Sequence, residues 1–203
     1  MENGMVEKKY IQAQELQEDS FRLGIKIFKS GFRPNFIVGI WRGGTPVGIA
    51  VQELLDYFGI TTDHIAIRTS AYEAINQRSK QITVHGMGYI IENINSEDSL
   101  LIVDDVFDSG LSVKAVLDTL RERTRKNTPR DIRIAVVYYK PTNNETDRVP
   151  DYYLYKTDNW LVFPHELNGL TREEIFEHKP GVRKLIEGVE TNGNYKRVYK
   201  KDT

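Results

Sequence analysis

Short hydrophobic runs recur through the middle of the chain and are separated by longer stretches of mixed character. Two of the runs, 36–40 and 100–103, contain no polar side chain, which is typical of strands buried on both faces of a parallel sheet. Each run is too short for an ordinary helix, so we interpret all of them as strands. The predicted strands cover residues 36–40, 64–67, 100–103, 132–139 and 152–155.

The stretches between the runs carry hydrophobic residues three and four positions apart, which is the spacing of one helix face. The most regular stretch extends from Val47 to Phe58, with Thr45 as the expected N-cap. Another follows the strand at 100–103, and residues 1–30 are expected to be largely helical. Strands and helices in alternation predict an α/β fold with a doubly wound, mostly parallel sheet of about five strands and helices on both faces.

Composition and charge exclude several classes of protein. The 203 residues include 28 Lys and Arg against 29 Asp and Glu, and this balance argues against nucleic acid as a partner. There is no cysteine, which excludes disulfides, a thiol nucleophile and thiolate metal sites. The polar first ten residues do not resemble a signal peptide, and no hydrophobic run is long enough to span a bilayer. We therefore expect a soluble cytoplasmic protein without membrane contact.

The strand at 100–103 leads into a cluster of carboxylates and then into the start of a helix. Three carboxylates crowded at a buried strand end are costly unless a cation or a hydroxyl-rich ligand lies beside them. The backbone N–H groups and hydroxyls that follow can hold a phosphate, so together they indicate a sugar phosphate. The carboxylates are Asp104, Asp105 and Asp108, and the candidate phosphate ligands are Ser109, Gly110, Leu111 and Ser112.

A second candidate site follows the strand at 36–40. Arg42 offers a fork for an oxyanion, and Gly43 and Gly44 allow a ligand to approach the backbone before a helix N-terminus. Taken alone, these three residues fit an ordinary strand-to-helix turn equally well. The chain contains neither a P-loop nor a dinucleotide fingerprint. Its Asp-Asp-x-x-Asp sequence follows a strand, whereas the isoprenoid synthases place that motif on a helix.

Residues 101–110 closely resemble the signature of the type I phosphoribosyltransferases, and 39–44 resemble the pyrophosphate loop of that family. The likeness extends over about residues 10–168. It implies that Arg42, Gly43 and Gly44 hold pyrophosphate and that residues 109–112 hold the 5′-phosphate of phosphoribosyl pyrophosphate. It further implies that Asp104 and Asp105 contact ribose hydroxyls and the waters of a bound Mg²⁺, and that Asp108 accepts a proton from N7 of the base.

The segment after the strand at 132–139 resembles the 6-oxopurine branch of the same family, in particular the bacterial xanthine-guanine and hypoxanthine enzymes. In these, a lysine after a strand donates to O6 and a downstream aromatic residue stacks on the purine. Lys140 and Trp160 stand at these positions, and the backbone at Leu161 would bond the purine edge. An ammonium group only donates, which suits O6 and not the amino group of adenine. Trp160 offers a large π-face for a base.

The resemblance also implies a domain organisation. Residues 1–168 would form the phosphoribosyltransferase domain, with a mobile loop at 68–88 that closes over the site through Ser70 and Tyr72. Glu166 stands where the family has an aspartate that contacts magnesium, so Asp105 and Glu166 are the candidate metal residues. Residues 169–203 would form an extension that is helical and then basic, with a capping box at Thr171, and the terminal segments would form a small hood.

The resulting prediction is a purine salvage enzyme that converts hypoxanthine, guanine or xanthine to the nucleoside monophosphate. Its partners would be phosphoribosyl pyrophosphate, a 6-oxopurine and other copies of the chain, because the family is usually dimeric or larger. Two alternatives stay open. One is a phosphoribosyltransferase for orotate or another pyrimidine. The other is a non-enzymatic regulator that senses phosphoribosyl pyrophosphate and binds nucleic acid through the basic tail.

Overall fold

The computed structural model describes residues 8–72 and 81–191 and contains a central six-stranded sheet. Five strands run parallel in the order β3-β2-β5-β6-β7, and β4 adds an antiparallel edge beside β3. The predicted fold class is confirmed, with β4 as a sixth strand. The strands are β2 (Phe36–Trp41), β3 (Asp63–Tyr72), β4 (Gln81–His85), β5 (Ser99–Phe107), β6 (Asp131–Tyr139) and β7 (Tyr152–Lys156).

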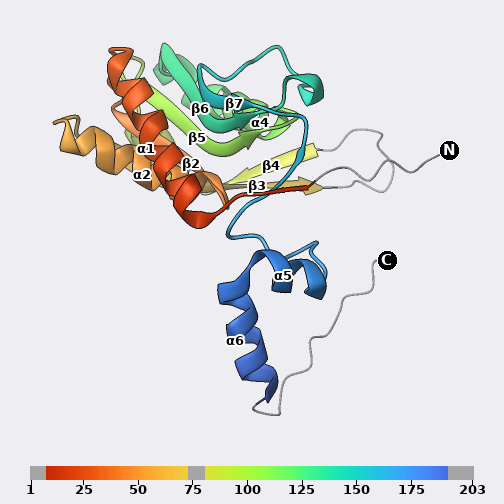
Figure 1. Ribbon diagram of the computed structural model, residues 1–203. Coiled ribbons are helices and arrows are strands. Elements are labelled where there is room, and N and C mark those ends of the chain that lie inside the picture. Colours follow the sequence, from red (N-terminus) through yellow and green to blue (C-terminus); the bar gives the residue numbers. More distant parts are fainter. Residues whose placement is uncertain (1–7, 73–80, 192–203) are drawn as a thin grey trace.

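Helices cover both faces of this sheet (Figure 1). α1 (Ala13–Lys29) and α2 (Gly44–Tyr57) share one core with Leu101 and Val103 of β5. α3 (Gly88–Asn93) and α4 (Leu111–Thr124) share the other core with Leu100 and Ile102. Successive residues of β5 thus point into opposite cores, which explains why the run at 100–103 contains no polar residue.

The two ends of the described chain meet in a small hood. β1 (Lys8–Tyr10) pairs in parallel with β8 (Trp160–Val162), and Val162 packs with Leu170 and Ile175. α5 (Arg172–His178) and α6 (Pro180–Thr191) follow and lie apart from the layers of the central sheet (Figure 1). The predicted capping box is present, since Thr171 Oγ1 accepts from the Glu174 N–H and the Glu174 carboxylate accepts from the Thr171 N–H.

Three sequence predictions need correction at element boundaries. Lys8–Tyr10 is a strand, and three residues are too few to leave a periodic signal. α2 begins at Gly44, so Thr45 lies inside the first turn and Gly43 occupies the cap position. β5 continues to Phe107 because its pairing with β6 continues to that residue, so Asp104 and Asp105 lie in the strand and not after it.

Parts of the predicted loop at 68–88 are strands in the structure. Residues 68–72 continue β3, and residues 81–85 form β4, paired with it in antiparallel register. Met87 and Ile90, at the other end of this segment, belong to the core beneath α4. The remainder, residues 73–80, lies outside the described residues, as do 192–203, which hold the predicted basic tail.

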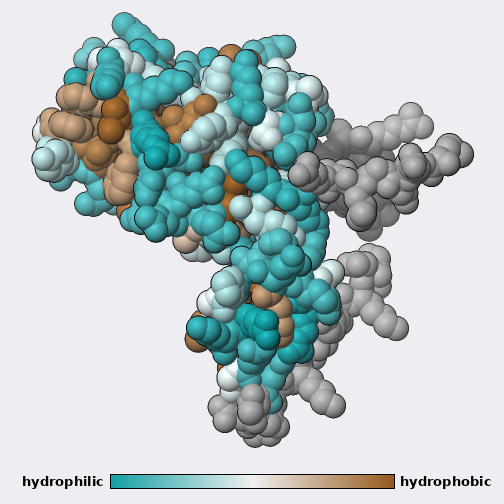
Figure 2. Space-filling model, in the orientation of Figure 1, coloured by the Kyte–Doolittle hydropathy of each residue, from teal (hydrophilic) through white to brown (hydrophobic). Residues whose placement is uncertain are grey.

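The visible surface is mostly hydrophilic, with hydrophobic patches on the side where α1 and α2 lie (Figure 2). Ile25 and Ile49 are exposed hydrophobic residues on these two helices. Among the described helices, none combines the length and the apolar character needed to cross a membrane.

Candidate active site

Two neighbouring parallel strands, β2 and β5, bring the two predicted ligand loops together. They pair in a register that places Gly39 opposite Val103, so the residues that follow lie at the same edge of the sheet. The loop after β2 lies directly against the acidic end of β5. A Cβ at Gly43 would lie 1.8 Å from Asp105 Oδ2, and one at Gly44 would lie 2.4 Å from the Val103 carbonyl oxygen. Only glycine permits this approach.

Asp104 and Asp105 place two interacting carboxylates side by side at this edge of the sheet. The Asp105 N–H donates to Asp104 Oδ1 (3.0 Å), and the Val106 N–H donates to Asp105 Oδ1 (2.8 Å). Burial raises the pKa of Asp104 well above its ordinary value, and the charge of Asp105 raises it further. Burial also raises the pKa of Asp105 to about 6, with a smaller contribution from the charge of Glu166. A cation or a set of hydroxyl donors would stabilise the ionised pair.

Asp108 and Lys140 meet across neighbouring strands. β5 and β6 are parallel and aligned so that Phe107 lies opposite Tyr139, and each of the two residues follows directly. Lys140 is buried, with 8% of its surface exposed, and its Nζ donates to Asp108 Oδ2 at 3.1 Å. The Asp108 side chain is 47% exposed, so the pair presents a donor and an acceptor side by side at the cavity surface. Lys140 is therefore not a solvated surface lysine.

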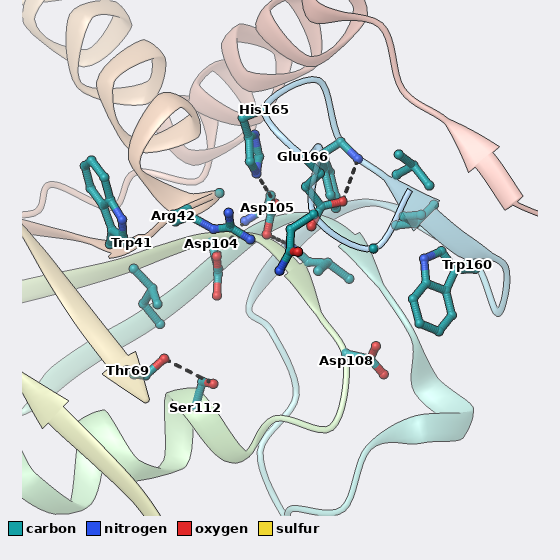
Figure 3. A pocket seen from close by; sticks show the side chains of 18 of the residues that line it. Trp41, Arg42, Thr69, Asp104, Asp105, Asp108, Ser112, Trp160, His165 and Glu166 are labelled. Atoms are coloured by element: carbon teal, nitrogen blue, oxygen red, sulfur yellow. Dashed lines mark hydrogen bonds and ion pairs between the residues drawn. The ribbon is translucent and has the colours of Figure 1, made fainter. Parts of the chain in front are cut away.

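These groups line a cavity of about 380 Å³, a size typical of small-molecule sites (Figure 3). In this view Trp160 and Asp108 lie on one side, and Trp41, Thr69 and Ser112 lie on the other (Figure 3). Trp160 comes from β8 and is 57% exposed, leaving its ring available for contact. The predicted residues that line this cavity are Arg42, Gly43, Asp104, Asp105, Asp108, Ser112, Lys140, Trp160, Leu161 and Glu166.

The turn predicted to hold phosphate leads into α4. Gly110 occupies the N-cap position with a φ of +77°, which favours glycine. A Cβ there would lie 2.7 Å from the Phe107 ring, so close packing also requires a glycine. Ser109 Oγ accepts from the Leu111 N–H at 3.4 Å, which keeps the turn tight. Of the four residues predicted to hold the phosphate, Ser112 lines the cavity and the other three form the adjoining turn.

Ser70 and Tyr72 both belong to β3, and Ser70 does not line the described cavity. The Ser70 hydroxyl instead pairs with His85 Nε2 of β4 at 3.0 Å. Thr69 lines the cavity and donates to Ser112 Oγ at 3.5 Å (Figure 3). Neighbouring side chains of a strand point to opposite faces. Extending the predicted strand at 64–67 by a few residues would therefore have placed Thr69 on the same face as Ile67 and Ser70 on the opposite face.

A family model described as a phosphoribosyl transferase domain matches residues 9–168. The chain belongs to the phosphoribosyltransferase family. This match includes every residue of the predicted site, together with β8 and the last two residues of β1 in the hood.

Several individual proteins are similar to this chain over half of its length or more. The hypoxanthine-guanine phosphoribosyltransferase of Streptococcus pneumoniae strain R6 is 24% identical over 189 residues, which is 92% of this chain and 97% of that protein. The bifunctional protein PyrR of Corynebacterium diphtheriae is 26% identical over 108 residues, 53% of this chain and 55% of that protein. The solved purine phosphoribosyltransferase of Pyrococcus horikoshii superposes with a TM-score of 0.65 at 25% identity, covering 81% of this chain and 98% of that one.

The phosphoribosyltransferase site suits a magnesium ion that arrives with a phosphorylated substrate. No group of three or more potential ligands occurs among the described residues, so the protein provides no complete metal cage there. Mg²⁺ is usually bound through one or two carboxylates plus substrate phosphates and water. The coupled pair of Asp104 and Asp105 fits that pattern, because burial leaves both carboxylates in need of a counter-charge.

Glu166 and His165 lie beside the Asp105 carboxylate (Figure 3). Glu166 Oε2 accepts from the Phe163 N–H at 3.0 Å, which directs this carboxylate toward its own turn. His165 Nε2 lies 3.7 Å from Asp105 Oδ2, and burial lowers the pKa of His165. The role of Glu166 at magnesium stays a prediction.

Proposed function

We propose that this phosphoribosyltransferase transfers the phosphoribosyl group of phosphoribosyl pyrophosphate to a 6-oxopurine. The observation that carries the proposal is the pair formed by Lys140 Nζ and Asp108 Oδ2, 3.1 Å apart in the cavity that Trp160 lines. A 6-oxopurine carries the O6 acceptor and the N7–H donor on one edge. That edge complements an ammonium donor beside a carboxylate acceptor. The relatives named for hypoxanthine-guanine and purine transfer support this assignment.

Adenine fits the same pair poorly. Its amino group would face the Lys140 ammonium, leaving two donors in contact and a buried charge without an acceptor. Sites built to pair a specific hydrogen-bonding group reject analogues without it by roughly 10⁴–10⁵. We therefore expect the enzyme to use at least one of hypoxanthine, guanine and xanthine, and to discriminate strongly against adenine.

The reaction moves one proton and one leaving group. N9 of the base attacks C1 of the ribose as the bond from C1 to pyrophosphate breaks, and positive charge develops on the sugar. Asp108, beside the base, accepts the proton from N7. Arg42 and the N–H groups of Gly43 and Gly44 hold the departing pyrophosphate. When bound, Mg²⁺ neutralises the pyrophosphate charge.

The remaining contacts fix the sugar. Asp104 and Asp105 accept hydrogen bonds from the ribose hydroxyls. Burial disfavours the ionised form of both carboxylates, and these hydroxyl donors stabilise that form when the ligand binds. The turn at Ser109, Gly110 and Leu111, together with Ser112, holds the 5′-phosphate at the start of α4. Trp160 stacks on the base from the hood.

A base panel tests this proposal. Magnesium-dependent pyrophosphate release is measured with hypoxanthine, guanine, xanthine, adenine, orotate and uracil, and each nucleoside monophosphate is identified chromatographically. Turnover with a 6-oxopurine and almost none with the other bases supports the assignment. Adenine as the best substrate would refute the roles given to Lys140 and Trp160 and leave only the family assignment.

A second candidate is transfer to a pyrimidine, because the hydrogen-bonding pattern that the Lys140–Asp108 pair complements also occurs on a pyrimidine. Uracil also presents an acceptor and an N–H donor on one edge, so the Lys140–Asp108 pair alone does not reject it. The orotate and uracil arms of the panel distinguish the two functions. Tight binding of phosphoribosyl pyrophosphate without turnover on any base would instead favour a regulator.

A further inference from the structure

Asp108 receives hydrogen bonds from two side chains of one short segment. Lys140 Nζ donates to its Oδ2 at 3.1 Å, and Asn143 Nδ2 donates to its Oδ1 at 2.7 Å. A carboxylate only accepts, so the nitrogen of the Asn143 amide must be the atom that faces it. An amide also donates without adding a charge that would compete with Lys140. Each carboxylate oxygen of Asp108 therefore has its own donor. Oδ2 accepts from a charged ammonium group, and Oδ1 accepts from a neutral amide.

The segment that carries Asn143 is itself fastened to the turn that carries Asp108. The Lys140 N–H donates to the Phe107 carbonyl at 2.9 Å, and the Glu145 N–H donates to the Ser109 carbonyl at 2.9 Å. Asn143 lies between these two backbone bonds, at the end of the 3₁₀ turn Pro141–Asn143, where its N–H reaches the Lys140 carbonyl at 3.3 Å. The Asn143 amide is therefore presented from a frame anchored on both sides of Asp108.

We propose that Asn143 is a positioning residue for Asp108, an inference that rests on the proposed function. In the proposed reaction Lys140 Nζ also donates a hydrogen bond to O6 of the base. Lys140 therefore divides its donors between the base and Asp108. Asn143 holds the other carboxylate oxygen, so Oδ2 keeps facing the base when Lys140 turns to O6. Without that bond a carboxylate with a 47% exposed side chain is held only by the lysine that the base also engages, and its alignment with N7 is lost more often.

The test is a kinetic double-mutant cycle on the full-length enzyme with its preferred base. Wild type, Asn143→Ala, Asp108→Asn and the double variant are compared for kcat and for the KM of each substrate. We expect Asn143→Ala to lower kcat by roughly 10- to 100-fold, the scale of a catalytic group misplaced by about an ångström, with the KM for phosphoribosyl pyrophosphate little changed. In the Asp108→Asn background the same change should cost almost nothing, because residues acting as one unit are non-additive.

Two further variants separate positioning from a structural effect. Asn143→Asp keeps the shape of the side chain and replaces the donor with an acceptor, so we expect a loss of kcat at least as large as that of Asn143→Ala. Asn144→Ala is the matched control. The Asn144 amide donates to the Arg148 carbonyl at 2.8 Å and accepts from the Thr146 N–H at 2.9 Å, both within the same segment. This variant therefore loosens the segment without removing a bond to Asp108, and its kcat should fall much less than that of Asn143→Ala. Asn143 is exposed, so we expect its variants to keep the wild-type melting temperature.

The outcomes distinguish this inference from the proposed function. A wild-type enzyme that transfers phosphoribose while Asn143→Ala retains its kcat overturns only the inference. The inference alone is also overturned if Asn143→Ala lowers kcat by the same factor in the Asp108→Asn background as in the wild type. It is likewise overturned if Asn144→Ala lowers kcat as much as Asn143→Ala does. A wild-type protein inactive on every base overturns the proposed function and the role of Asn143 with it.

Discussion

Replacing Lys140 with methionine tests the proposed reading of the base most directly. Lys140→Met keeps the length of a side chain that is only 10% exposed and removes only its charged end. Asp108 keeps its bond from Asn143 and lies partly in solvent, so losing the ion pair leaves no isolated buried charge. We therefore expect the free energy of unfolding to change by less than about 1.5 kcal/mol, the usual limit for a swap that conserves volume.

The effect on catalysis should be larger and selective. A hydrogen bond from a charged donor contributes about 1.5–3 kcal/mol, which corresponds to a loss of roughly 10- to 150-fold in kcat/KM for a 6-oxopurine. Activity with adenine should not fall, because the variant removes the donor that repels its amino group. The preference for 6-oxopurines over adenine should thus decrease by at least the same factor.

The assay is a competition between a 6-oxopurine and adenine, read as the ratio of the two nucleotides formed. Lys114→Met is a matched control, since Lys114 forms an ion pair with Asp118 on the exposed face of α4 at 2.5 Å. Equal losses with both bases, or a large drop in melting temperature with no change in preference, would refute the assignment of Lys140 to O6.

Three more perturbations test the remainder of the site. Gly43→Ala should cost about 1–3 kcal/mol of stability and weaken binding of phosphoribosyl pyrophosphate, since the new Cβ displaces Asp105. Urea unfolding and calorimetry measure both, and Gly181→Ala, whose Cβ meets no atom within 4 Å, should show neither effect. Asp108→Asn should bind phosphoribosyl pyrophosphate normally and lose turnover by roughly 10²–10⁴-fold, so near-normal turnover would remove it from proton transfer. Because burial raises the pKa of Asp105 from 3.8 to about 6, the ligand-free protein should lose up to roughly 3 kcal/mol of stability as the pH rises from about 4 to about 6. Asp105→Asn should reduce this dependence in urea unfolding to the part contributed by the raised pKa of Asp104, and an unchanged slope would contradict the assignment.

The centre of the sheet could be predicted because β2, β5 and β6 are buried on both faces. Such strands read as continuous hydrophobic runs, and the helices between them show a clear 3.6-residue period. β1 and β4 escaped prediction for the opposite reason. β1 has three residues, and β4 is an antiparallel edge strand in which partly buried and exposed positions alternate from residue 82 to residue 85, within a polar stretch. Neither contributes enough hydrophobic residues to stand out.

The part of the candidate site whose polar residues lie close together in the sequence could be predicted. Asp104, Asp105 and Asp108 crowd one strand end, and Gly110 follows them. Lys140 and Trp160 could be singled out only through the family resemblance, because one lysine or one tryptophan has no distinctive local pattern. Asn143 left no signal in the sequence at all, since its partner is 35 residues away and the contact depends on the register of β5 and β6.

The pairing of β1 with β8 has a consequence for the order in which the molecule assembles. Lys8 lies opposite Trp160, so the short sheet closes a loop of about 150 residues. Contacts between such distant residues form late, whereas neighbouring elements dock early. During synthesis on the ribosome the first strand must wait, unpaired, until residue 160 has emerged. The side of the cavity that carries Trp160 is therefore completed last, after the sheet that carries the carboxylates is already in place.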